Sequence, residues 1–154
     1  MNILADLFHK EPFKKTISLV ANCDIVLRGP DGKVKDRRFI HNTVTTPGKN
    51  GAADQVLASP SLNKPTHMAV GTGTPSGTAL GTESDRNALS SKTRSNAVVT
   101  MVGDWAAGDA TAAITEAGIF DAASTGNMWV SASFSVINKG ASDTLQITWT
   151  LTFA

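Results

Sequence analysis

The C-terminal segment TLQITWTLTFA constrains the fold most, because apolar and polar side chains alternate along it from Thr144 to Phe153. A period of two places the apolar side chains on one face of a β-strand and the polar ones on the other. A helix would scatter the same residues around its surface. The segment therefore predicts a strand with one buried face, formed by Leu145, Ile147, Trp149, Leu151 and Phe153.

Six further segments are expected to be strands, so the chain is predicted to be mainly β. One is NMWVSASFSVI, residues 127–137, which alternates in the same way. Its expected inward side chains are those of Met128, Val130, Ala132, Phe134 and Val136. The other segments are residues 16–28, 37–46, 66–70, 95–102 and 113–122.

Two segments of turn composition predict antiparallel hairpins. NKGASD, residues 138–143, lies between the two alternating C-terminal segments, which are therefore expected to pair with each other. GPDGK, residues 29–33, supplies Pro, Asp and Gly for a tight turn between the first two strands.

Helix is expected to be scarce. Residues 50–57 could form one short helix with Ala53, Val56 and Leu57 inward, and residues 83–91 could form a turn or two. About seven short strands with one or two short helices predict an antiparallel β-sandwich or barrel. A length of 154 residues fits a single domain, expected at residues 16–154, preceded by an extended N-terminal arm at residues 1–15.

The arm carries apolar side chains that need a cover. Ile3, Leu4, Leu7 and Phe8 fall on one face of a possible helical turn or two, which Pro12 stops before Phe13. So short a helix is marginal by itself, and its apolar side must be buried against the protein's own domain or against another subunit. Both alternatives remain open, and the expected partner-binding residues of the arm are Ile3, Leu4, Leu7, Phe8 and Phe13.

Composition excludes several classes of function. The net charge of +1 combines a basic N-terminal part with an acidic C-terminal part, but the basic residues are not interleaved with stacking aromatics and Tyr is absent. No apolar run approaches the roughly 20 residues that span a bilayer. Cys23 is the only cysteine, so no internal disulfide can form, and its place on an apolar strand face predicts a buried, inert thiol. We therefore expect neither a nucleic-acid partner nor a membrane partner.

The glycine-rich stretch HMAVGTGTPSGTALGTE, residues 67–83, could suggest a phosphate-binding loop. A dinucleotide fingerprint needs a third glycine three residues after the second, but Gly77 comes one place too late and no long helix follows. A P-loop needs Gly-Lys-Ser/Thr, which does not occur after Gly77. The stretch is therefore interpreted as a mobile, solvated connection, and no nucleotide cofactor is expected.

No catalytic or metal-binding constellation is apparent. The three histidines are far apart in sequence, and no Gly-x-Ser-x-Gly nucleophile motif occurs. Asp104 and Asp109 flank WAAG and could act as paired carboxylates or metal ligands, but this is ordinary loop composition. Glu116 is bracketed by apolar residues and is expected to accept hydrogen bonds from backbone amides. We expect no catalytic residue, no cofactor and no metal.

The three tryptophans differ in context. Trp149 is on the apolar face of the last strand and is expected in the core. Trp129 falls among serines on the opposite face from Met128 and Val130, which suggests a second covered surface. Trp105 is expected in a loop, as an anchor for a binding partner.

A series of segments resembles a known group of proteins. In chain order they are DIVLRGPDGKVK, HNTVTTPGKN, HMAVGTGT, TALGTE followed by an arginine, AITEAGIFDA and DTLQITWTLTF. Over about residues 24–153 this order resembles a widespread group of small virion proteins of tailed bacteriophages. ITEAGIFDA together with the final alternating strand is the most specific part. The resemblance implies a place on the particle, either as a head decoration protein or near the attachment end of a tail fibre, and it carries no catalytic motif.

The expected function is that of a non-enzymatic virion structural protein, assembled in the host cytoplasm. A capsid decoration (cement) protein that binds the major capsid protein or another virion protein as a homo-oligomer is the leading hypothesis. A tail, collar or fibre-attachment protein is one alternative. A carbohydrate-binding β-sandwich module, with exposed Trp105 and Trp129 as a stacking platform, is another, and a hydrolase would require Asp104 and Glu116 to converge.

Overall fold

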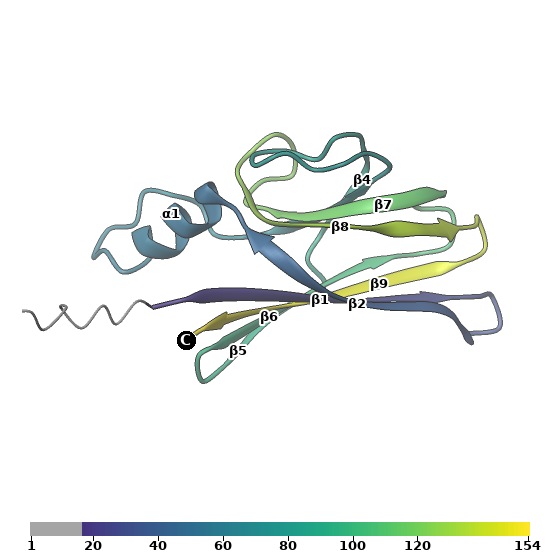
Figure 1. Cartoon of the computed structure of the whole chain (residues 1–154), viewed down its shortest axis with the longest axis horizontal. Coiled ribbons are helices and arrows are strands. Elements are labelled where there is room, and N and C mark those ends of the chain that lie inside the picture. Colours follow the sequence, from purple (N-terminus) through teal and green to yellow (C-terminus); the bar gives the residue numbers. More distant parts are fainter. Residues whose placement is uncertain (1–16) are drawn as a thin grey trace, which may run out of the picture.

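A computed structural model describes residues 17–154, so the arm residues Ile3, Leu4, Leu7, Phe8 and Phe13 lie outside the described residues. The described chain contains one helix and nine strands (Figure 1). In chain order they are β1 (Leu19–Arg28), β2 (Val34–Val44), α1 (Thr46–Asp54), β3 (His67–Gly71), β4 (Glu83–Ala88), β5 (Ser91–Ser95), β6 (Val98–Trp105), β7 (Ala112–Phe120), β8 (Met128–Lys139) and β9 (Thr144–Phe153).

The nine described strands form one antiparallel sheet in the order β4-β3-β7-β8-β2-β1-β9-β6-β5, which curls into a half-barrel. Figure 1 shows the layer with β7 and β8 lying over the layer with β1, β9 and β6. Strand β2 joins the layers, because most of it pairs with β1 while Thr43 and Val44 pair with β8. The mainly β, antiparallel class is confirmed, but the expected number of seven strands is too low.

The two missed strands lie at the edges of the sheet. Strand β5 has the sequence SKTRS, and all of its residues are exposed. Strand β4 has the sequence ESDRNA, where one or two helical turns were expected. An edge strand has a hydrogen-bonded partner on one side only and need not bury a face, so its sequence need not alternate.

One predicted hairpin is correct and the other is wrong. Strands β1 and β2 pair around residues 29–33 as expected. Strand β8 pairs with β7 and β2, whereas β9 pairs with β1 and β6, so residues 140–143 connect the two layers instead of closing a hairpin. The period of two determines which face of a strand is buried, but it does not determine which strand pairs with it.

The buried faces agree with the alternation along most strands. Leu145, Ile147, Trp149 and Leu151 are buried on β9 and Cys23 is fully buried on β1, whereas Phe153 at the end of β9, which was also expected to be buried, is 39 % exposed. Burial raises the pKa of the Cys23 thiol well above its ordinary value, which agrees with the expectation of an inert thiol.

The alternation changes phase within β8. The register against β7 shifts between Ile114 and Glu116, where β8 has additional residues. As a result Val136, which was expected inward, is exposed, and its neighbour Ile137 is buried. An irregularity of this kind bends the strand and locally interrupts the alternation of faces.

Helix α1 begins earlier than expected and contacts the sheet through glycines. The Thr45 side chain caps it by accepting a hydrogen bond from the Gly48 amide. Its buried residues are Gly48 and Gly51, which lie directly against Trp129, whereas Val56 is 86 % exposed. A short helix is therefore confirmed here, but its expected bounds of 50–57 and its apolar inward face are wrong, because close packing here depends on the absence of side chains.

Candidate functional site

The glycine-rich stretch is fastened to the sheet by one buried carboxylate. Glu116 on β7 is fully buried, and its Oε1 accepts hydrogen bonds from the amides of Gly73 (2.9 Å) and Thr82 (2.7 Å). Its Oε2 accepts a third hydrogen bond from the Gly81 amide (2.8 Å). The expectation for Glu116 is confirmed. The stretch is solvated at its tip, as expected, and both of its ends are held by Glu116.

The glycines of this loop serve the same contact. A side chain at Gly71 would overlap the Thr82 carbonyl oxygen and the Glu116 carboxylate, and one at Gly81 would overlap the backbone of Thr74. Close approach of two backbone segments is a common reason for glycine in a strand or loop. The amides of Gly73, Gly81 and Thr82 already donate to Glu116, so they are not available to hold a phosphate.

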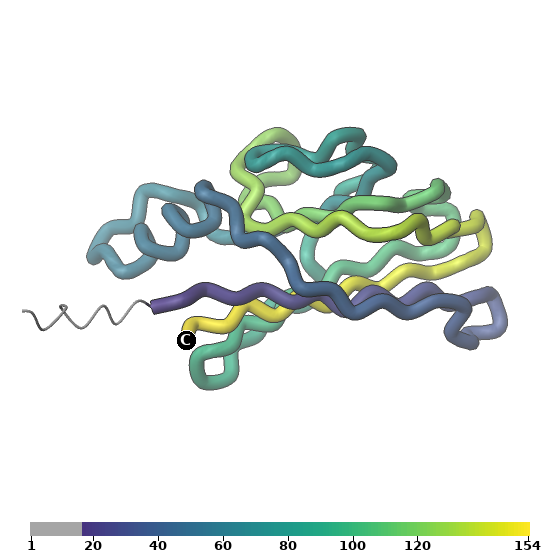
Figure 2. The backbone as a smooth tube through the Cα atoms, in the orientation of Figure 1, coloured from purple at the N-terminus to yellow at the C-terminus, as the bar shows by residue number. Residues whose placement is uncertain are grey.

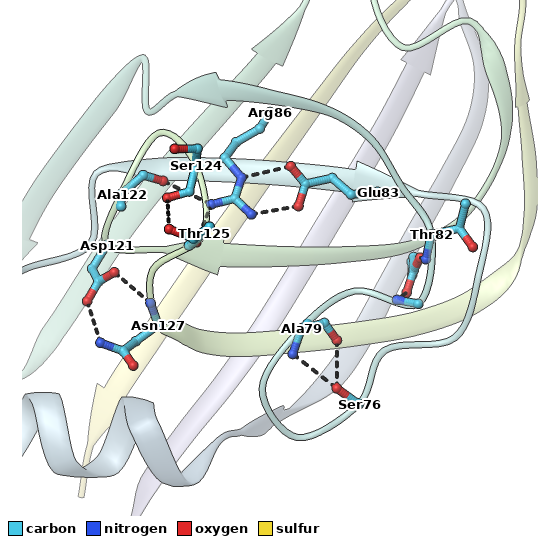
Figure 3. Close-up of polar contacts among 12 residues, drawn as sticks. Ser76, Ala79, Thr82, Glu83, Arg86, Asp121, Ala122, Ser124, Thr125 and Asn127 are labelled. Atoms are coloured by element: carbon cyan, nitrogen blue, oxygen red, sulfur yellow. Dashed lines mark hydrogen bonds and ion pairs between the residues drawn. The ribbon is translucent and has the colours of Figure 1, made fainter.

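Arg86 on β4 joins its own strand to the loop that follows β7, which is distant in the sequence (Figure 3). Its Nε and Nη2 donate to the Glu83 carboxylate at 2.9 and 2.6 Å. Its Nη1 donates to the carbonyl oxygens of Ala122 (3.0 Å) and Thr125 (2.8 Å). The guanidinium also lies 3.7 Å from the centre of the Phe120 ring, a cation–π contact, and the Arg86 side chain is only 8 % exposed.

Asp121 organises the loop that follows β7. Its Oδ1 accepts a hydrogen bond from the Asn127 amide (2.7 Å), and its Oδ2 accepts one from Asn127 Nδ2 (2.9 Å). Thr125 and Gly126 adopt positive φ angles of 52° and 73°, which turn the chain back toward β8. We call Glu83, Arg86, Glu116 and Asp121 the loop-anchor cluster, because Arg86, Glu116 and Asp121 each hold a loop of the same chain in place and Glu83 pairs with Arg86.

A second set of charged groups stabilises the connection between β8 and β9. Lys139 is buried and donates through Nζ to the carbonyl oxygens of Ala106 (3.0 Å) and Asp143 (2.8 Å), and burial lowers its pKa. The buried Asp143 carboxylate accepts hydrogen bonds from Lys35 Nζ and from the Gly140 amide, which lower its pKa.

The other carboxylates considered from the sequence do not converge. Asp104 on β6 accepts hydrogen bonds from Ser90 Oγ (2.5 Å) and Gln146 Nε2 (2.8 Å). Asp109 accepts one from the Ala106 amide (3.3 Å). Asp104 and Glu116 lie in different layers of the sheet. Within residues 17–154, no group of three or more His, Cys, Asp or Glu side chains could hold a metal ion.

The tryptophans are all in the interior. Trp105 is the last residue of β6 and only 1 % exposed, so the expectation of a loop residue that anchors a partner is wrong. The period of two continues to the end of β6 and turns this side chain inward. Trp129 is buried beneath α1, which confirms a second covered surface. Two buried tryptophans cannot form the stacking platform that the carbohydrate-binding alternative requires.

An open groove of about 560 Å³ lies between the segment after α1 and strands β5, β6 and β9. Its floor is apolar and is formed by Val99, Met101, Trp129, Leu151 and Phe153. The exposed cationic side chains of Lys64, Lys92 and Arg94 line the rest. No local pattern indicates this groove, because its lining residues come together only through the order of the strands.

A second uncovered surface is the outer face of β2, β1, β9 and β6. Its central row consists of Thr148, Thr150 and Thr152 of β9, and its most exposed large apolar side chain is that of Phe39, at 68 %. The smooth tube in Figure 2 shows α1, the loop before β4 and the loop between β7 and β8 on the side of the other layer. We call this surface the threonine face.

None of the described helices is long and apolar enough to cross a membrane. No protein-family model, no curated protein and no solved structure matches this chain. Function is therefore inferred from the residues of this chain and from their arrangement.

Proposed function

We propose that this protein is a non-enzymatic structural protein of a tailed-bacteriophage particle. More specifically, it is a capsid decoration protein that binds the major capsid protein lattice and stiffens the shell. The protein acts as a homo-oligomer and, by this proposal, is located in the virion. A tail, collar or fibre-attachment component is the second candidate, because the same resemblance includes proteins of that kind.

One observation supports this proposal most. VGTGT and TALGTE with Arg86 are neighbours in the sequence, and both contact the more distant ITEAGIFDA in the loop-anchor cluster. Glu116 of ITEAGIFDA holds the ends of the glycine-rich loop, and Arg86 holds the loop after Phe120. The residues on which the resemblance depends therefore act together to hold the loops of this chain. This favours a fold in common with the virion proteins over a chance similarity of short segments.

The uncovered surfaces are consistent with a protein whose function is to bind neighbouring subunits of the particle. The threonine face and the groove are both exposed, and the apolar arm residues lie outside the described part of the chain. Burial of each arm side chain against a neighbouring subunit contributes about 1.5 to 3 kcal/mol. Many copies on a lattice add avidity, so each individual contact can be weak.

Copy number in purified virions tests the proposal. Quantitative mass spectrometry of particles from cells that express this chain should find it in the virion. Hundreds of copies per particle identify a head protein, whereas a handful identify a tail component. Recovery of the chain only as free protein in the host cytoplasm would reject both versions.

Removal of residues 2–15 tests the contribution of the arm. Because the described domain begins after this segment, the shortened chain should fold, with unchanged circular dichroism, but should lose occupancy on the particle. The control is Gly77→Ala, which changes an exposed loop position with open space around it and should bind as the unmodified chain does. Unchanged occupancy of the shortened chain would exclude a role for the arm.

A further inference from the structure

The groove lies where the chain enters the described domain. The Ser18 amide donates to the Ala154 carbonyl oxygen (2.6 Å), and the Ala154 amide donates to the Ser18 carbonyl oxygen (2.9 Å). The next pair in this ladder is Leu19 with Phe153, and Phe153 forms part of the groove floor. The described part of the chain therefore begins beside the groove.

The chemistry of the arm matches that of the groove. Ile3, Leu4, Leu7 and Phe8 supply apolar side chains for an apolar floor, and Asp6 is the only charged residue between them. The groove presents three cationic side chains above that floor, so a carboxylate carried among apolar residues finds a favourable potential.

The sequence before β1 favours a neighbouring copy over the chain's own groove. The pairing of Ser18 with Ala154 continues the ladder between β1 and β9 beyond Leu19, so the chain is extended where it enters the domain. A return into its own groove requires the chain to reverse its direction before β1, and residues 13–17, FKKTI, contain no Gly, Pro, Asn or Asp, the residues that favour such a turn. The nearest such residue is Pro12, which itself favours an extended conformation for the preceding Glu11.

We propose that residues 3–8 of one copy bind in the groove of a second copy, so that the protein assembles by exchange of its arms. This inference rests on the proposed function, because it identifies the neighbour of the arm as another copy of the same chain. Residues 9–16 span up to about 28 Å when extended, enough to reach a copy that touches this end of the domain. The exchange buries the apolar floor and the apolar arm together.

Disulfide trapping between two different full-length variants tests the exchange in solution, without any particle. One variant carries Leu7→Cys and the other carries Arg94→Cys at the groove. The matched control replaces Arg94→Cys with Ser95→Cys, because Ser95 is exposed on the same strand and its neighbour in the ladder, Val98, lies on the threonine face side. Cys23 does not compete, because it is fully buried.

The expected result is a cross-linked heterodimer on a non-reducing gel, formed about tenfold faster with Arg94→Cys than with Ser95→Cys. Equal rates for the two pairs would overturn the proposal. A disulfide that forms only within a chain carrying both Leu7→Cys and Arg94→Cys would show docking of the arm on its own domain and would also overturn it.

The oligomeric state of the full-length protein in solution gives a second test. Leu7→Asp should lower the sedimentation coefficient from that of an oligomer to that of a monomer, with unchanged circular dichroism. An unchanged oligomer would contradict the exchange. Failure of both experiments, together with loss of virion occupancy on removal of residues 2–15, would mean that the arm binds a different virion protein, which leaves the proposed function intact.

Discussion

At the scale of single residues, buried charged groups hold the backbone of the loops. Glu116 is the clearest example, since three amides of the glycine-rich loop donate to one carboxylate. This role was predictable, because a carboxylate within an apolar strand must find hydrogen-bond donors. The role of Arg86 was not predictable, because two of its acceptors, Ala122 and Thr125, are in a loop distant in the sequence whose approach depends on the complete fold.

Replacement Glu116→Gln should lower the free energy of unfolding by about 2 to 3 kcal/mol. The amide is uncharged and turns an NH₂ group toward backbone donors. Urea denaturation followed by tryptophan fluorescence measures the effect. The control is Asp109→Asn. The Asp109 carboxylate accepts a single long hydrogen bond of 3.3 Å, so this replacement should change the free energy of unfolding by no more than about 0.5 kcal/mol. Equal effects of the two replacements would contradict the anchoring role.

Acid should destabilise the protein partly through Asp143. The pKa of this carboxyl is lowered in the folded state by hydrogen bonds from Lys35 and Gly140, so the folded state favours the ionised form. Its contribution to stability is complete above the ordinary carboxyl pKa of about 3.9 and is lost as the pH falls through the folded-state pKa. Thermal melting between about pH 5 and 2 should therefore be less pH-dependent in Asp143→Asn than in the unmodified protein. An unchanged slope would refute the assignment.

At the scale of the elements, helix α1 shows that glycine can mark a packed surface. The sequence places two glycines within the helix, which normally weakens it, and the apolar side chains of Val56 and Leu57 suggested a later helix. The structure instead brings the backbone of α1 directly onto Trp129. Apolar periodicity could not predict this contact, because the residues that make it have no side chains.

The replacement Gly51→Ala should destabilise the protein by about 1 to 3 kcal/mol, although alanine is the better helix former. Its methyl group would overlap the Trp129 ring. The matched control is Gly77→Ala, where a methyl group meets open space, and it should be close to neutral. Differential scanning calorimetry compares the two, and a stabilised Gly51→Ala variant would disprove the close packing.

The strands show which part of the fold alternation determines. The buried faces of β1 and β9 were predictable, because a period of two has one apolar side. The pairing of β8 and β9 was not, because the same alternation fits a hairpin and a connection between layers equally well. The edge strands β4 and β5 were missed for lack of any periodic signal.

At the scale of the whole molecule, the class of fold was predictable and the candidate site was only partly so. Repeated alternation with turn residues indicates an antiparallel β-domain, but the order of the strands decides where a groove forms. Phe153 and Trp129 line one surface although they lie on different layers, β9 and β8. The partner-binding role of Ile3, Leu4, Leu7, Phe8 and Phe13 remains a prediction, since these residues lie outside the described part.

The pairing of Ser18 with Ala154 has a practical consequence for labelling. A fluorescent protein fused after Ala154 would lie at the entrance to the groove and would block the binding of an arm there. Weak fluorescence of the particles would then result from the fusion and not from a low copy number. A small epitope inserted between Gly77 and Thr78 is on an exposed tip on the other layer, held from below by Glu116. Immunogold imaging through that site would leave both chain ends untouched.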